Sequence, residues 1–107
     1  MKLVIAITHS DDRKALQDAL LTAGYQATAL SSTGVFLMHG NTTFLIGAQE
    51  DQIEDIMGII KDCCKSRKQL ISSLPMENAA VPVVFPIEVL VGGAVVFVLD
   101  VDRHEKF

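Results

Sequence analysis

The segment Ala27–Gly47, ATALSSTGVFLMHGNTTFLIG, decides the fold that we expect for this chain. Two runs typical of β-strands, Ala27–Leu30 and Thr42–Ile46, flank a loop from Ser31 to Asn41 that contains consecutive hydroxyl residues and two glycines. A hairpin that only turns needs about two to five residues. We therefore expect a loop that binds something between two strands, and an ordinary connecting loop is the alternative.

Hydrophobic periodicity predicts two helices, Asp11–Ala23 and Asp51–Cys64, each with an apolar stripe at helical spacing. Gly24 is expected to end the first helix, and Ser10 or Asp11 to cap its start. The β-prone runs predict strands at Lys2–Thr8, Gln26–Leu30, Thr42–Ala48, Lys68–Ser72, Phe85–Val91 and Ala94–Val101.

The last two of these strands are joined by Gly92-Gly93, a pair typical of a tight β-hairpin, so we expect them to pair with each other. A second irregular loop is predicted from Leu74 to Val84, where prolines interrupt the chain. The order β-α-β-β-α-β, followed by a C-terminal β-hairpin, predicts an α/β (α+β) fold of the ferredoxin-like type.

Composition limits the class of partner. At 107 residues, half of them hydrophobic, the chain is expected to form a single domain, residues 1–107, with more apolar surface than so small a core buries. We therefore expect an oligomer. The formal net charge of −4 argues against nucleic acid, because phosphate backbones require a clustered basic face. A small anionic ligand stays open, because helix ends and backbone amides bind phosphate without net positive charge.

No segment predicts export or insertion into a membrane. The apolar run Leu3–Ile7 is followed almost at once by charged residues, so it is too short for a signal peptide. No apolar run approaches the length of a membrane span. The two cysteines, Cys63 and Cys64, are adjacent and match no metal or redox motif. A cytoplasmic location is therefore the expectation.

Residues of catalytic type do not form a recognisable group. The three histidines, His9, His39 and His104, are scattered, so we expect no metal site and no cofactor. The hydroxyls that begin the loop, from Ser31 to Thr33, have no identifiable base partner. The sequence therefore predicts a protein without enzymatic activity.

Specific motifs such as GNTTFLIG and GGAVVFVL occur within blocks at Met1–Ile7, Ser32–Gly47, Ile60–Leu70 and Phe85–Phe107. Together these blocks resemble the PII-like cyclic-di-AMP receptor family of Gram-positive bacteria, also called PstA or DarA. The resemblance implies a homotrimer of PII-like, ferredoxin-like subunits. It also implies that cyclic di-AMP binds in clefts between subunits, under two loops that here correspond to Ser31–Asn41 and Ser73–Val84.

The resemblance assigns ligand-binding roles to the residues at the family's pocket positions, which are Ala27, Thr28, Phe36, Leu37, Asn41 and Gly47. We add Gln26 and Val35, which stand where the family has Arg and Gly. Glutamine lacks the charge and the forked donors that arginine offers to a phosphate, and valine adopts a positive φ only at a cost. Lys106, where the family often has Gln, would restore positive charge near the phosphates or remain solvated.

We therefore expect a non-enzymatic signal-transduction protein that senses cyclic di-AMP and changes the order of its two loops on binding. Three alternatives remain at this point. The same fold would bind an adenine mononucleotide or another adenylated compound, or the trimer would act only through protein partners. The last is a small enzyme or metal binder, since this common fold does not by itself imply a function. The downstream protein partner is unknown.

Overall fold

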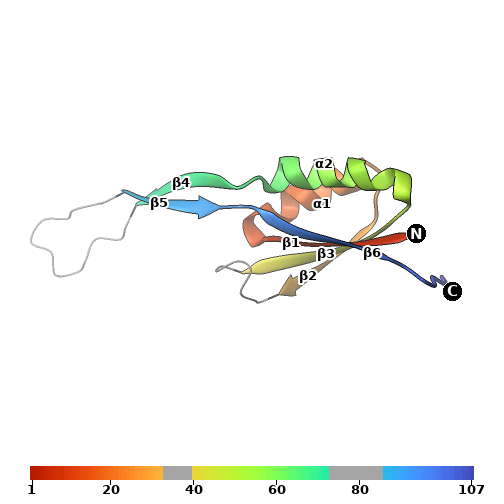
Figure 1. Ribbon diagram of the computed structural model, residues 1–107. Coiled ribbons are helices and arrows are strands. Elements are labelled where there is room, and N and C mark those ends of the chain that lie inside the picture. The colour runs from red at the N-terminus through yellow and green to blue at the C-terminus, as the bar shows by residue number, and fades with distance from the viewer. Residues whose placement is uncertain (33–39, 73–85) are drawn as a thin grey trace, which may run out of the picture.

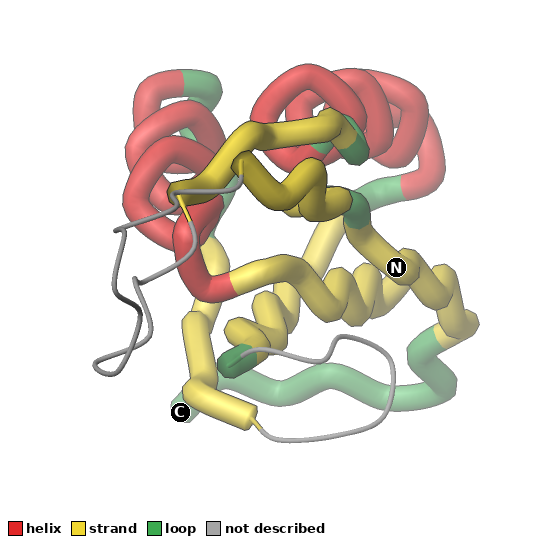
Figure 2. The backbone as a smooth tube through the Cα atoms, turned by 90° about the vertical axis from the view of Figure 1, so that its left-hand side faces the viewer, coloured by secondary structure: helices red, strands yellow, loops and turns green. Residues whose placement is uncertain are grey.

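The protein has two layers, helices over a β-sheet, and a long extension. The structure is a computed structural model that describes residues 1–32, 40–72 and 86–107, without the side chains of residues 32, 69–72 and 86–89. Two α-helices lie on one face of a four-stranded sheet, and a second, two-stranded sheet extends away from it (Figure 1). Figure 2 shows that both helices cover the same face of the larger sheet.

The predicted helices and strands are all present, with small shifts at their ends. The strands are β1 (Lys2–His9), β2 (Ala27–Ser32), β3 (Asn41–Ala48), β4 (Arg67–Ser72), β5 (Pro86–Val91) and β6 (Ala94–Asp100). The helices are α1 (Arg13–Thr22) and α2 (Ile53–Cys64), each preceded by a single 3-10 turn, η1 (Ser10–Asp12) and η2 (Glu50–Gln52). In the part of the chain that the structure describes, neither helix is long and apolar enough to cross a membrane. The predicted α+β fold class is confirmed.

The hydrophobic core lies between the four-stranded sheet and the helices. Successive residues of a strand point to opposite faces, so every second residue of β1 and β3 faces the helices. The helices contribute residues three or four positions apart, which share one face of an α-helix. The buried hydrophobic residues that pack together are Val4, Ala6, Leu16, Leu20, Phe44, Ile46, Ala48, Ile56, Ile60 and Cys64.

Gly24 ends helix α1, as predicted, and the structure shows that it does so in a Schellman motif. The Gly24 amide donates to the Leu21 carbonyl at 3.0 Å, and the Tyr25 amide donates to the Leu20 carbonyl at 2.9 Å. Gly24 has φ +89°, in the left-handed region that glycine adopts without the strain of a Cβ. The chain therefore leaves the helix sharply and enters β2.

The predicted cap at the start of this helix is wrong. The helical segment begins earlier, with η1, and the residue before it is His9. The His9 Nδ1 atom accepts a hydrogen bond from the Asp11 amide at 3.2 Å, whereas the Ser10 hydroxyl donates to the Gly40 carbonyl. Ser10 therefore connects the start of the helix to the start of β3 and does not cap the helix.

The predicted pairing of the last two strands is also wrong. Strand β5 pairs with β4, and β6 pairs with β1, so β5 and β6 belong to different sheets. Gly92 and Gly93 have φ +81° and +90°, and the Gly93 amide donates to the Cys64 carbonyl at 2.5 Å. The glycine pair therefore directs the chain from one sheet into the other. A local hairpin motif is overridden here, because the free edge of β1 offers β6 a longer pairing, from Lys2↔Asp100 to Thr8↔Ala94.

The antiparallel pair β4–β5, which we call the arm, projects away from the larger sheet (Figure 1). The larger sheet has the order β2-β3-β1-β6, so β6 lies beside β1 at one edge. The molecule is elongated as a result, with principal extents of 64 × 22 × 19 Å. The end of the sheet opposite the arm holds both chain termini (Figure 1).

Candidate functional site

The four-stranded sheet has a face that the helices do not cover, which we call the open face. Strand alternation and the pairing register place on it the residues whose neighbours point into the core: Leu3, Ile5, Ile7, Thr28, Leu30, Asn41, Thr43, Leu45, Gly47, Val95, Phe97 and Leu99. Several are apolar and well exposed, with Leu30 at 48% and both Phe97 and Leu99 at 46%. Three of the residues predicted to bind ligand, Thr28, Asn41 and Gly47, therefore share one face.

Four of the predicted residues line a single hollow of about 570 Å³ where β2 begins and β3 ends, which we call the tail hollow. They are Gln26, Ala27, Thr28 and Gly47, and the hollow is completed by Met1, Leu45, His104 and Lys106. The strands meet here because β2 pairs antiparallel with β3, with Ala27 opposite Ile46 and Thr28 opposite Leu45. Volumes of this size are typical of pockets for small organic ligands.

The C-terminal tail, residues 101–107, is anchored beside β1. The Val101 amide donates to the Met1 carbonyl at 3.2 Å. The Lys2 ammonium pairs with the Asp100 carboxylate and, at 3.3 Å, with the Glu50 carboxylate. The hydrogen bond from Lys2, together with its charge, holds the pKa of the Asp100 carboxyl below its usual value, and the same contacts raise the pKa of Lys2. These contacts place the tail at the edge of the tail hollow.

Asn41 does not line the tail hollow. It begins β3, six residues before Gly47, which corresponds to about 20 Å along a strand. It lies opposite His9 on β1 and Ser32 on β2, and it is 3% exposed. Its Oδ1 atom is buried without a hydrogen-bond partner in the structure as described, which is unfavourable for a polar group. Within one chain, Asn41 is therefore separated from the four predicted residues that line the tail hollow.

The remaining predicted residues, Val35, Phe36 and Leu37, lie outside the described residues, as does the second predicted loop. The first loop is shorter at both ends than predicted. Ser31 and Ser32 belong to β2, where they pair with Thr42 and Asn41 of β3. These two serines therefore lengthen the pairing between β2 and β3, because the backbone of serine forms the same hydrogen bonds as the backbone of the apolar residues before it.

The sequence did not predict a polar cluster that connects the arm to η1, at the start of the first helix. The Asp12 carboxylate, 4% exposed, accepts a hydrogen bond from the Arg67 guanidinium at 3.0 Å, and this contact raises the pKa of Arg67. The guanidinium also donates to the Lys65 carbonyl at 3.2 Å. Gly92 packs closely against the Arg67 guanidinium and the Lys65 carbonyl, so that a Cβ at Gly92 would lie 2.7 Å from each of these two groups. The partners are 55 positions apart in the sequence, and no local motif marks them.

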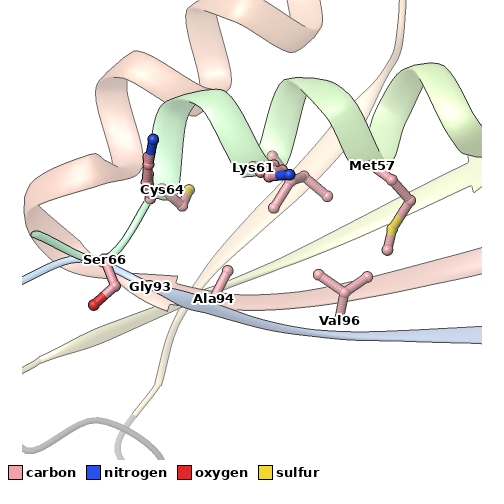
Figure 3. A pocket seen from close by; sticks show the side chains of 9 residues that line it. Met57, Lys61, Cys64, Ser66, Gly93, Ala94 and Val96 are labelled. Atoms are coloured by element: carbon pink, nitrogen blue, oxygen red, sulfur yellow. The ribbon is translucent and has the colours of Figure 1, made fainter.

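A second hollow, of about 340 Å³, lies between α2 and β6 and contains none of the predicted residues. Figure 3 shows Met57, Lys61 and Cys64 of α2 on one side of it and Ala94 and Val96 on the other. Burial raises the pKa of the Cys64 thiol to about 12, so it is protonated at neutral pH and a poor nucleophile. Over the described residues, no group of three or more His, Cys, Asp or Glu side chains is placed to hold a metal ion.

Fold and site together describe a small α+β protein of the PII-like class with a ligand-sized hollow on its sheet. The sequence matches the family model of cyclic-di-AMP receptors over residues 1–107, so the chain belongs to this family. It is also similar to a crystal structure of a functionally unknown protein from Pediococcus pentosaceus, with 42% sequence identity and a TM-score of 0.79 over 99% of this chain and 96% of that one. The resemblance seen in the sequence is confirmed, and family membership supports a signalling role based on binding cyclic di-AMP.

Proposed function

We propose that this chain is a non-enzymatic signalling receptor that binds cyclic di-AMP in clefts between the subunits of a homotrimer. Residues 1–107 would form a single domain that acts in the cytoplasm, where the free thiols of Cys63 and Cys64 stay reduced. The observation that supports the proposal most is the match to the cyclic-di-AMP receptor family over the whole chain. The geometry of the sheet supports its two further parts, the assembly and the position of the ligand.

The open face supports assembly. It presents Leu30, Phe97 and Leu99 to solvent around a patch of further apolar side chains. Contiguous apolar patches of this kind mark interaction surfaces. Strand β6 is in addition an edge strand of the sheet as described, and an exposed apolar edge readily pairs with another chain. Burial of this face against two further copies would remove both sources of instability.

The separation of Asn41 from the tail hollow supports a site between subunits. Within one chain, the hollow lies at one end of β3 and the unpartnered Asn41 oxygen at the other. When open faces pack against each other, each ligand would contact elements of two chains. The Asn41 amide, with a donor and an acceptor, would then meet the edge of an adenine base. The Thr28 hydroxyl and the Gln26 amide in the hollow would donate to the phosphates.

Titration calorimetry with cyclic di-AMP, AMP, ATP and cyclic di-GMP tests the ligand. We expect cyclic di-AMP to bind best, and the double variant Gln26→Arg with Val35→Gly to bind at least about tenfold more tightly. Arginine adds a hydrogen bond from a charged group, which contributes about 1.5–3 kcal/mol. Asn41→Ala should abolish binding.

The outcomes separate the alternatives. A preference for AMP or ATP would mean the same fold with a different ligand. No nucleotide binding by an intact trimer would favour a role through protein partners. Sedimentation that shows a stable monomer at micromolar concentration would refute the site between subunits.

A further inference from the structure

The C-terminal tail has two chemically different sides. Arg103 and Glu105 form an ion pair, with the Arg103 Nε atom 2.8 Å from the Glu105 carboxylate. The residues that alternate with them, His104 and Lys106, line the tail hollow. This alternation is that of an extended chain, in which residues two apart point to the same side. One side of the tail is therefore neutralised, and the other directs two cationic-type side chains at β2 and β3.

The positive charge on the hollow side forms no ion pair in the structure as described. The residues that line the tail hollow include no carboxylate. Two acidic side chains near in the sequence are engaged elsewhere, because Asp100 pairs with Lys2 and Glu105 with Arg103, and a third, Asp102, does not line the hollow. Neither His104 nor Lys106 has an ion pair or a hydrogen bond among the described residues. An ammonium without an ion pair is thus present at this hollow in a chain with a net charge of −4.

The other polar side chains of the hollow are hydrogen-bond donors. Gln26 offers an amide N–H₂ group and Thr28 a hydroxyl, and Gly47 exposes backbone because it has no side chain. Donors combined with an ammonium and no carboxylate select an anion. Lysine binds phosphate as a point charge and does not need the planar geometry of arginine.

We propose that His104 and Lys106 bind the phosphate groups of the ligand in the tail hollow, and so replace the positive charge that Gln26 lacks. This inference rests on the proposed function and adds which residues take the phosphates. The adenine bases would be recognised elsewhere, and the affinity for an inorganic phosphate anion would require the tail in addition to the donors of Gln26 and Thr28.

The test compares Lys106→Gln and His104→Gln with Arg103→Gln in the full-length protein. Arg103→Gln removes one positive charge from the opposite side of the same tail, so it is the matched control. By calorimetry with cyclic di-AMP, we expect Lys106→Gln to weaken binding about tenfold, the loss of one charged hydrogen bond. His104→Gln should weaken it less, and Arg103→Gln should change it less than about twofold. Gln26→Arg should restore binding to Lys106→Gln.

A second probe separates this inference from the identity of the ligand. Inorganic pyrophosphate is titrated into the labelled protein, and the amide resonances of Thr28 and Gly47 are followed by NMR. We expect these resonances to shift in the wild type and not in the double variant His104→Gln with Lys106→Gln. That result would support the anion site even if cyclic di-AMP failed to bind. Cyclic di-AMP binding unaffected by both tail substitutions, or no pyrophosphate shift in the wild type, would overturn the inference.

Discussion

Replacement of Gly92 with alanine tests whether the arm is packed tightly against the rest of the protein. Gly92 has φ +81°, where an L-residue costs about 1–2 kcal/mol. The new Cβ would also lie 2.7 Å from the Lys65 carbonyl oxygen and from the Arg67 guanidinium. The guanidinium is able to move, but the carbonyl belongs to the backbone between α2 and β4. Overpacking of this kind costs about 1–3 kcal/mol, so we expect a total loss of about 2–5 kcal/mol in the free energy of unfolding.

Gly93→Ala is the matched control. Gly93 has a similar φ of +90°, but the nearest atom to an added Cβ is the Ser66 Cβ at 3.9 Å, an ordinary contact. This variant should therefore lose only the conformational part, about 1–2 kcal/mol. The predicted difference between the two variants, about 1–3 kcal/mol, isolates the packing at the junction.

Urea denaturation followed by circular dichroism measures the difference, at one protein concentration because the stability of an oligomer depends on concentration. Hydrogen exchange should in addition show faster exchange of the β4 and β5 amides in Gly92→Ala than in Gly93→Ala. If the two variants are equally stable and exchange alike, the close packing of Gly92 against Lys65 and Arg67 is refuted.

Three further results are expected. Phe97→Asp, on the open face, should dissociate the proposed oligomer in sedimentation experiments, whereas Leu21→Asp, 70% exposed on α1, should not; an intact oligomer in both would place the interface elsewhere. Because the pKa of the Cys64 thiol is raised to about 12, iodoacetamide at pH 8 should modify Cys64 only after denaturation, and rapid labelling of the native protein would contradict its burial. Because Lys2 lowers the pKa of Asp100, this contact stabilises the fold at neutral pH and is lost as the pH falls through the lowered folded-state pKa of the carboxyl. Lys2→Met should move the NMR titration of the Asp100 carboxyl to higher pH, and an unchanged titration would exclude the pairing.

The parts of the fold that depend on local sequence could be predicted. Gly24 ends α1 because the left-handed conformation of a Schellman motif strongly favours glycine, a property visible in the sequence. The alternation in β1 and the helical stripe of α2 likewise require only neighbours a few positions apart. Pairing over longer distances could not be predicted in this way. The Gly92-Gly93 motif is typical of a hairpin, but the competing partner of β6 lies at the other end of the chain, in β1.

The candidate site shows the same division. Thr28 and Gly47 converge because they lie on adjacent strands of one antiparallel pair, whose register follows from the hairpin. In the sequence His104 is one of three scattered histidines, because its position in the hollow beside β2 depends on how β6 pairs and where the tail then runs. The contact between Asp12 and Arg67 also depends on the final topology. In the proposed assembly Asn41 joins the site through a second chain, a contact that depends on packing between subunits and not on local sequence.

The arm joins the rest of the protein at a junction beside Gly92, so its far end moves further than its base in any rotation about that junction. Each of its strands has six residues, or about 20 Å at the usual rise, so a rotation of about 10° at the junction displaces the far end by roughly 3.5 Å. A displacement of that size is enough to make or break a hydrogen bond. Small movements of the backbone between Cys64 and Arg67, where α2 ends, are therefore amplified along the arm. The close packing of Gly92 against Lys65 and Arg67 opposes such a rotation.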